Sequence, residues 1–325
     1  MVTTNGRTGG GGADDPESGR ENGRGNGQWY PPEWPDRIRR LAHGELEPVP
    51  PRRASTVLLL RTDTDGALAV HLLRRRASMA FAGGAYAYPG GAVDPRDERD
   101  VPWSGPSPRE WAARLGVEPE VAQAVVCAAV RETFEEAGVL LAGPDPATVV
   151  ADTTGEEWEA DRAALAGHEL SFGDFLERRG LLLRSDLLGG WARWITPEFE
   201  PRRYDTWFFV AALPDGQRTA GVSTEADRAV WIRPAEAVTG YDRGELLMMP
   251  PTVSTLRALL PYGDVPAVLT AAGERDLTPV LARARLVGEE IVLSWPGHEE
   301  FTKHLLSRPP GPPHTPATAT PGADA

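Results

Sequence analysis

The sequence predicts an α/β fold, an α/β/α sandwich in which a mixed β-sheet is flanked by helices. Three features predict it: a β-hairpin pattern at residues 54–74, a long amphipathic helix pattern at 120–137, and a strongly apolar strand pattern at 206–213. Further short helix patterns follow that strand. Because strands and helices are mixed along the chain, we expect the helices to cover a single sheet.

The first half of the predicted domain opens with a Pro-rich arm that contains a short helix near residues 35–43. The aliphatic and β-branched runs 54–60 and 68–74 are strands, and the turn Asp63-Thr64-Asp65-Gly66 joins them as a hairpin. A Gly-rich stretch follows this hairpin. A short helix is then predicted at 108–115, because a proline at its first position is favourable there.

The second half begins with the long helix at 120–137, after which the run Val139-Leu140-Leu141 is expected to start another strand. Residues 156–190 have a helical pattern, in which Phe172, Phe175 and Leu176 recur at helical spacing, and Gly189-Gly190 breaks it. We interpret this part as a helical insertion. The later elements are expected to be strands at 206–213, 229–232 and 290–295 and helices near 234–238, 251–260, 266–272 and 277–284.

The chain has 325 residues, and both ends have compositions that do not favour folding. Segment 1–28 is rich in Gly, Asn, Arg and acidic residues, and segment 309–325 is rich in Pro, Thr, Ala and Gly. Neither can bury enough apolar surface to offset the entropy of ordering, so both are predicted to be disordered tails. Residues 29–308 are then one domain with insertions at about 98–119 and 150–200.

The formal net charge of −13 argues against a general nucleic-acid-binding protein. The chain has a single cysteine, Cys127, so no disulfide can form within it, which fits a reducing cytosol. The N-terminus lacks the apolar core of a signal peptide, and no segment is long and apolar enough to span a bilayer. We therefore expect a cytoplasmic protein without a membrane partner, and the sequence leaves a homodimer open.

The long helix carries the clearest functional pattern. Glu132, Glu135 and Glu136 are spaced i, i+3 and i+4, so they lie on one side of the helix. Like charges at this spacing destabilise a helix by a few tenths of a kcal/mol per pair, roughly, and a bound divalent cation would compensate. Gly138 is expected to end the helix in a left-handed conformation. The apolar residues fall on the opposite side: Val126, Cys127, Val130, Phe134 and Ala137.

A Gly-Gly pair precedes the three glutamates by about forty residues. Gly90 and Gly91 allow the backbone to turn tightly and to approach a ligand closely, so they are candidate substrate-binding residues. Within the helix, Arg131 precedes Glu135 by four residues and can brace it in a charge-assisted pair.

These segments resemble the signature of the Nudix hydrolase family, which is Gly, five residues, Glu, seven residues, then Arg-Glu-aliphatic-x-Glu-Glu-x-Gly-aliphatic. The second half corresponds to residues 131–139 (RETFEEAGV), with Thr133 at the aliphatic position. In the first half Gly91 is followed, after five residues, by Asp97 in place of Glu, and the spacing to the second half is much longer. That interruption resembles the branch of peroxisomal-type acyl-CoA or CoA diphosphatases. The resemblance covers roughly residues 50–260.

The resemblance implies a Nudix-like fold and a hydrolase in which Glu132, Glu135 and Glu136 hold Mg²⁺ (or Mn²⁺) against a pyrophosphate. Magnesium prefers hard oxygen ligands and needs only one or two carboxylates besides the substrate. A metal-activated water would attack phosphorus and break a phosphoanhydride in a nucleoside diphosphate-linked substrate, such as CoA, acyl-CoA or another nucleotide conjugate. Arg131 would support the catalytic carboxylates.

Two carboxylate roles stay open at the level of sequence. The general base is either Glu132, within the motif, or Glu225, in a loop before a predicted strand. Asp97 is either a residue of the metal site or an acid of a surface loop. His298 has no spaced partners and is expected to be structural or exposed.

Arginines near the motif offer two further candidates for substrate binding. Arg74 is either a solvated strand end or an anion clamp, and Arg203, with its neighbour Arg202, could grip phosphate. The alternative to an enzyme is a Nudix-like module that senses a nucleotide without hydrolysing it. The complete set of three glutamates favours the enzyme.

Overall fold

The computed structural model describes residues 33–78, 82–221, 226–287, 290–294 and 303–305. The predicted tails, 1–28 and 309–325, lie outside these ranges. The helices are α1 (Trp34–Ala42), α2 (Pro108–Leu115), α3 (Pro119–Ala137), α4 (Glu156–Ala166), α5 (Phe172–Arg179), α6 (Pro234–Asp242), α7 (Pro250–Arg257) and α8 (Val265–Ala272), with 3₁₀ turns η1 (Pro95–Glu98) and η2 (Ser185–Leu187).

The main sheet has eight strands of mixed direction, as the sequence predicted. Its strands are β1 (Arg52–Thr62), β2 (Leu68–Arg75), β3 (Tyr86–Ala87), β4 (Gly90–Ala92), β8 (Gly189–Ile195), β9 (Tyr204–Ala212), β10 (Ala226–Ile232) and β11 (Val280–Leu281). The order is β10-β2-β1-β9-β8-β11, with β3 beside β2 and β4 beside β1. At the centre, β1 and β9 run parallel, whereas β2 and β8 run antiparallel to them.

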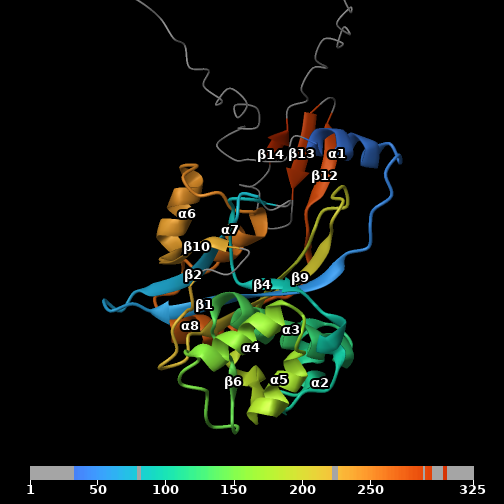
Figure 1. Ribbon diagram of the computed structural model, residues 1–325. Helices are drawn as coiled ribbons and strands as arrows, with labels where there is room; N and C mark the ends of the chain where they lie inside the picture. Colours follow the sequence, from blue (N-terminus) through green and yellow to red (C-terminus); the bar gives the residue numbers. More distant parts are fainter. Residues whose placement is uncertain (1–32, 79–81, 222–225, 288–289, 295–302, 306–325) are drawn as a thin grey trace, which may run out of the picture.

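The two faces of this sheet carry two separate cores. Side chains alternate along β1, so Leu58 and Leu60 belong to one core and Val57 and Leu59 to the other. The first core is completed by residues from α1, α6, α7 and α8, and the second by residues from α2, α3 and α5. Figure 1 shows α2–α5 on one side of the sheet and α1, α6 and α7 on the other. Because both faces are covered, the apolar run of β1 is continuous.

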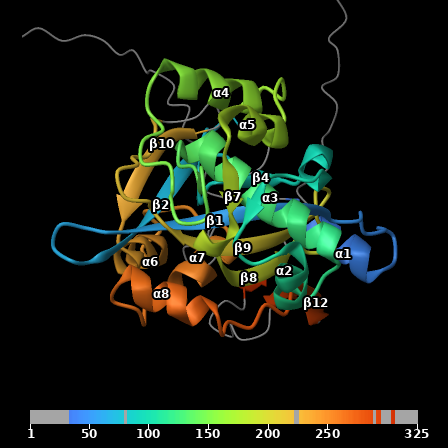
Figure 2. The ribbon, with the colours of Figure 1, turned by 90° about the horizontal axis from the view of Figure 1, so that it is seen from below.

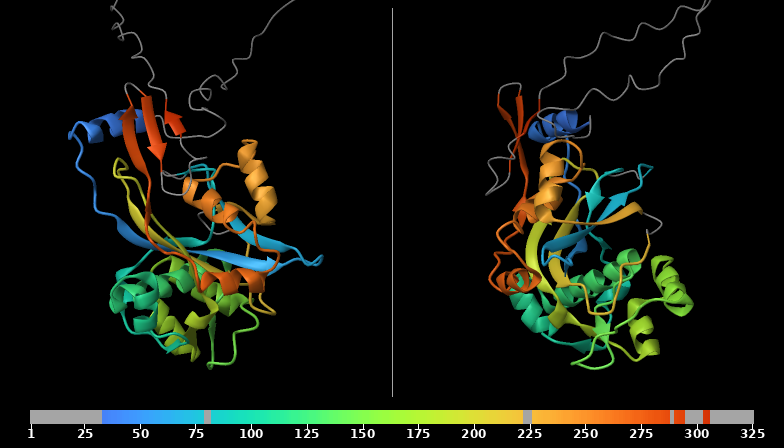
Figure 3. Two further views of the ribbon diagram at one scale, coloured as in Figure 1. Left: turned by 180° about the vertical axis from the view of Figure 1, so that it is seen from behind. Right: turned by 90° about the vertical axis from the view of Figure 1, so that its left-hand side faces the viewer.

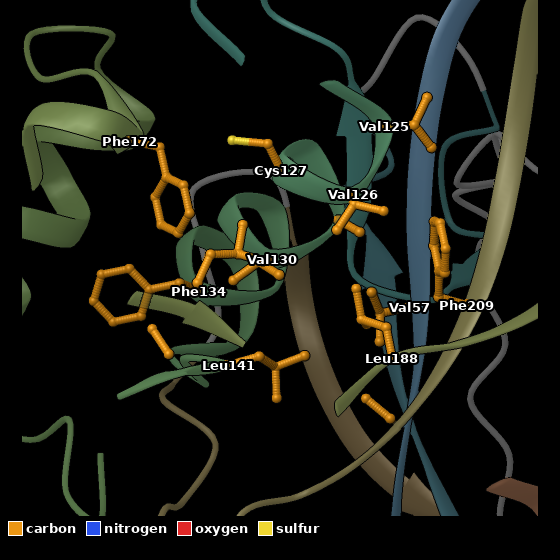
Figure 4. Close-up of a cluster of buried hydrophobic side chains, with 14 of the residues drawn as sticks. Val57, Val125, Val126, Cys127, Val130, Phe134, Leu141, Phe172, Leu188 and Phe209 are labelled. Carbon is orange, nitrogen blue, oxygen red and sulfur yellow. The ribbon is translucent and has the colours of Figure 1, made fainter. Parts of the chain in front are cut away.

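Helix α3 lies beside β1 of the main sheet (Figure 2) and contributes its apolar side to the second core. Its five predicted apolar residues, 126, 127, 130, 134 and 137, are all buried. Val126 and Phe134 lie in one cluster with Val57 of β1 and Phe209 of β9 (Figure 4). The helix ends at Gly138, whose φ of 69° is the left-handed conformation expected for this position. This packing fixes the end of α3 that carries the glutamates.

The predicted insertion at 150–200 is only partly helical. Helices α4 and α5 occupy its first part, but residues 182–195 contain β7 (Leu182–Arg184) and β8. Gly189 and Gly190, which were predicted to break the helical pattern, are the first two residues of strand β8. A Cβ atom on Gly189 would lie 2.6 Å from the Cβ of Ala272, so the glycine allows α8 to pack on this strand. Strand β7 belongs to a small sheet with β5 (Trp103–Ser104) and β6 (Ala142–Gly143).

Two other predictions were wrong. Residues 139–141 are buried but do not form a strand, and β6 includes only the next two residues. The helix predicted at 277–284 is replaced by β11 and by β12 (Arg283–Val287), because β11 pairs with the edge of β8. Strand β12 pairs with β13 (Glu290–Ser294), which pairs with β14 (Lys303–Leu305). Figure 3 shows these strands beside α1.

No helix within the described ranges combines the length and the apolar character needed to cross a membrane.

Buried His71 on β2 gives a prediction about stability. Its ring packs against Trp231, with centroids 5.1 Å apart, and neither ring nitrogen has a hydrogen-bond partner in the described structure. Burial, with a smaller contribution from Arg61, lowers the pKa of His71 from 6.5 to about 4. The unfolded chain therefore takes up a proton at a higher pH than the folded chain does.

The stability linked to His71 is complete above pH 6.5 and is lost progressively as the pH falls towards 4. The loss amounts to about 3 kcal/mol of unfolding free energy. His71→Phe should remove this component, so urea denaturation at pH 7 and pH 4.5 should show a smaller pH dependence than in the wild type. Identical pH dependence in both proteins would contradict the assignment.

Candidate active site

The glutamate stripe of α3 faces a cavity that opens between this helix and the main sheet. Glu132, Glu135 and Glu136 line this cavity of about 710 Å³, together with Gly90 and Gly91 of β4. The cavity also extends along β1, β8 and β9 and reaches α1 and the start of α7. The structure therefore brings together the two halves of the sequence motif, which are separated along the chain by about forty residues.

Arg131 organises the carboxylates from inside the protein. Its guanidinium is almost fully buried and donates through Nη1 to Glu132, at 2.8 Å, and to Glu135, at 3.1 Å. Nε and Nη2 donate to the two oxygens of Asp97 at 3.0 and 2.9 Å, and Nη2 also donates to the carbonyl of Ala92 at 3.0 Å. All five N–H groups of the side chain are used. The predicted brace between Arg131 and Glu135 is present.

Asp97 belongs to this network, and its interpretation as a surface loop acid was wrong. Its side chain is 1% exposed, and it accepts a hydrogen bond from the backbone N–H of Asp94 at 2.8 Å as well as two from Arg131. Asp97 does not line the cavity, so it positions Arg131. The short turn η1 carries it back to α3.

The negative charge of this cluster is poorly balanced. The carboxylates of Asp97, Glu132 and Glu135 share a single guanidinium, and Glu136 lies beside them on the cavity wall. Burial raises the pKa of Glu132 to about 7, and burial also raises the pKa of Glu135. A divalent cation would relieve this excess, and carboxylate oxygens are the ligands that Mg²⁺ prefers. The donor set therefore fits such an ion.

The described part of the chain has no three His, Cys, Asp or Glu side chains already arranged as metal ligands. The contacts explain this, because Arg131 binds Glu132 and Glu135, whereas the backbone N–H of Gly90 donates to Glu136 at 2.8 Å. Binding of an ion would therefore require these oxygens to turn towards the cavity.

Close approach of backbone to carboxylate explains the Gly-Gly pair. A Cβ atom on Gly91 would lie 2.5 Å from Oε1 of Glu132, and one on Gly90 would lie 2.5 Å from the carbonyl oxygen of Ser55. Strand β4 pairs with β1 through these two glycines, which places them beside the glutamates.

Gly91→Ala should reduce activity more than stability. The added methyl group meets the end of the Glu132 side chain, which can move only by displacing its carboxylate from the cavity wall. We expect a loss of at least about 10-fold in kcat, since displacement of a catalytic group by about 1 Å can cost on the order of 10²-fold. Turnover and thermal unfolding measured together test this, and an active Gly91→Ala variant would show that Glu132 does not need its position.

Two predicted phosphate-binding arginines lie elsewhere. Arg74 of β2 forms an ion pair with Asp227 of β10, at 2.6 Å. Arg203 is buried and donates to the carbonyls of Thr196 and Val49 at 3.1 and 2.7 Å. Neither residue lines the cavity. For Arg74 the strand explains this, because neighbouring side chains along β2 point to opposite sides.

The neighbours of these arginines line the cavity instead. Arg75 and Arg202 both do so, as does Arg52 at the start of β1. Within the described ranges none of the three forms an ion pair, whereas Arg74 does. The position of Arg202 is compatible with the prediction that it could grip phosphate, whereas Arg75 was not predicted from the sequence.

The apolar wall of the cavity was not predicted from the sequence, because nothing in the motif points to it. Five residues form this wall, from α1, the β3–β4 connection, β8, β9 and the start of α7: Trp34, Tyr88, Trp194, Phe208 and Met249. His168, which reaches the cavity from the loop between α4 and α5, was not predicted either. Two candidates, Glu225 and His298, lie outside the described residues.

Comparison with known proteins agrees with this geometry. A family model described as the NUDT19 Nudix domain matches residues 112–259. The acyl-coenzyme A diphosphatase NUDT19 of Gallus gallus is 28% identical over 210 residues, which are 58% of this chain and 51% of that protein. The protein of the same name from Homo sapiens is 27% identical over 235 residues, which are 60% of this chain and 61% of that protein. The chain thus spans about half to three-fifths of the length of these curated relatives.

A solved structure extends the likeness to the fold. The crystal structure of a NUDIX hydrolase from Alicyclobacillus acidocaldarius is 27% identical and superposes with a TM-score of 0.58. The match covers 68% of this chain and 96% of that one. The mixed sheet flanked by helices is therefore the same in both proteins.

Proposed function

Since the chain belongs to the Nudix hydrolase family, we propose that it hydrolyses a phosphoanhydride bond in a nucleoside diphosphate-linked substrate. The observation that carries this proposal is the set of three α3 glutamates on a cavity wall, held by Arg131 and adjoining a Gly-Gly strand. The relatives named acyl-coenzyme A diphosphatase support CoA or acyl-CoA as the first substrates to test.

A divalent metal ion is the general cofactor of Nudix hydrolases, and we propose Mg²⁺ or Mn²⁺ for this chain. Glu132, Glu135 and Glu136 would hold it, because they combine hard oxygen donors with an excess of negative charge. When bound, the ion supplies Lewis-acid chemistry that neutralises the charge of a diphosphate and acidifies water.

Side chains and backbone groups of the chain itself position the three glutamates and accept the proton of the attacking water. Arg131 holds Glu132 and Glu135 in place, and Asp97 in turn orients Arg131 through both carboxylate oxygens. The backbone N–H of Gly90 orients Glu136. We propose Glu132 as the base that accepts a proton from the attacking water, because its carboxylate lines the cavity beside the other two glutamates.

The far side of the cavity suits the rest of a nucleotide conjugate. Arg52, Arg75 and Arg202 can hold phosphate oxygens, since guanidinium groups bind them with two donors. The apolar wall, which includes Trp34 and Phe208, can cover an apolar or aromatic part of the ligand.

A screen of nucleoside diphosphate derivatives with Mg²⁺ or Mn²⁺ tests the proposal. CoA, an acyl-CoA, ADP-ribose and a dinucleoside polyphosphate should be included, with product identification by mass spectrometry. We expect at least one to give two phosphate-containing products, and EDTA to stop the reaction. Tight binding of a nucleotide without turnover of any compound would instead favour a nucleotide-sensing module.

The cytoplasmic location and a homodimer stay predictions of the sequence. Cell fractionation and sedimentation of the purified chain test them.

A further inference from the structure

His168 occupies an unusual backbone position at the edge of the cavity. It follows α4 within the inserted segment and lines the cavity together with Glu135. Its φ is +59°, and within the described ranges Ala82 is the one other non-glycine residue with positive φ. A histidine in this conformation is uncommon, and such residues are concentrated at functional sites. The side chain is 67% exposed, so a ligand in the cavity that it lines can reach the ring.

Arg96 holds this histidine by its backbone and by its ring. Its Nη1 donates to the carbonyl of His168 at 3.0 Å, and its Nη2 lies 2.7 Å from the ring Nδ1. Arg96 is itself fixed by Asp94, with 2.8 Å from Nε to Oδ1 and 2.8 Å from Nη2 to Oδ2. Asp94 and Arg96 belong to the loop that follows the Gly-Gly strand. This loop therefore ties the inserted segment to the motif.

The contact with Arg96 selects one tautomer of the ring. A guanidinium has donors but no acceptor, so Nδ1 accepts the hydrogen bond from Nη2 at 2.7 Å and does not carry the proton. The carboxylate of Asp94 is farther from Nδ1, at 3.5 Å, and its Oδ2 already accepts from Arg96. The neutral imidazole then carries its proton on Nε2, which becomes a donor. A donor at this edge of the cavity complements the carboxylates, because a diphosphate has more oxygens than one metal ion can engage.

We propose that His168 is a substrate-binding residue, whose Nε2–H donates to a non-bridging oxygen of the substrate's diphosphate. This inference rests on the proposed function, and it assigns to the inserted segment a direct role in holding the substrate. Arg96 does not line the cavity and is a positioning residue, since it acts on the substrate only through the histidine, and Asp94 fixes Arg96.

The test compares His168→Gly, His168→Asn and Ala82→Gly. Glycine removes the ring and also relieves the backbone strain, so a purely structural His168 would give a stable and fully active variant. We expect His168→Gly to keep or gain thermal stability and to raise KM by about 10- to 100-fold, the range for one hydrogen bond to a charged group.

Asparagine tolerates positive φ and retains an N–H donor, so His168→Asn should recover part of the lost affinity. Ala82→Gly relieves strain outside the cavity and should leave KM unchanged. An unchanged KM in His168→Gly would overturn the proposal.

A binding measurement separates this inference from the proposed function. The probe is α,β-methylene-ADP, which cannot be hydrolysed at the bridging position, titrated calorimetrically in the presence of Mg²⁺. If the wild type binds it but hydrolyses no diphosphate, the proposed function fails, and weaker binding by His168→Gly still supports the role of His168. Equal binding by the two proteins overturns that role, as does absence of binding by the wild type, whereas the proposed function is decided by the turnover screen alone.

Discussion

Glu136→Gln is expected to lower kcat by on the order of 10²- to 10³-fold without unfolding the protein, the effect of removing one preorganised electrostatic group. The amide oxygen of glutamine can still accept the hydrogen bond from the N–H of Gly90, so strand β4 keeps its contact with α3. What is lost is the negative charge on the cavity wall. Steady-state kinetics over a range of Mg²⁺ concentrations would measure the effect.

The matched control is Glu120→Gln in the first turn of the same helix. Glu120 is exposed and does not line the cavity, so this variant loses the same charge from α3 away from the site. It should retain wild-type kcat and cation dependence. If Glu136→Gln also retained both, the assignment of the glutamate stripe to the active site would be wrong.

Arg131→Met is expected to lower the free energy of unfolding by about 3–5 kcal/mol, the cost of breaking a buried ion pair by removing one partner. Methionine fills part of the space but leaves Asp97, Glu132 and Glu135 without their shared cation. Chemical denaturation at pH 8 would measure the loss. The difference from wild type should narrow at pH 5, because burial already raises the pKa values of both glutamates and protonation removes the unpaired charge.

Arg74→Met is the control for this comparison. Its ion pair with Asp227 is partly exposed, and surface pairs contribute about 0–1 kcal/mol. Equal losses in Arg74→Met and Arg131→Met would show that the buried network does not stabilise the fold.

The parts of the fold that depend on local pattern could be predicted from the sequence. The hairpin of β1 and β2, helix α3 and its end at Gly138 follow from side-chain periodicity and one left-handed glycine. Strand β8 could not be predicted in this way, because Gly189 and Gly190 look like breakers until α8 packs against Gly189 and Leu277 packs against Gly190. Long-range packing, which the local pattern does not contain, decides such segments.

In the candidate site, too, residues grouped by local spacing could be predicted, whereas residues placed by long-range packing could not. The spacing of Glu132, Glu135 and Glu136 within one helix was sufficient to group them. Asp97 depends on a loop and an insertion that return the chain to α3, so spacing alone could not decide its place. The choice between Arg74 and Arg75 required the orientation of β2, which is set by its pairing with β10.

The most direct test of the central claim is a titration with Mn²⁺, followed by electron paramagnetic resonance, of the wild type and of a Glu135→Gln/Glu136→Gln double variant. The account predicts that the wild type binds Mn²⁺ and that the double variant, folded to the same extent by circular dichroism, loses this binding. Equal Mn²⁺ binding by the two proteins would contradict the claim that the α3 glutamates hold the metal ion.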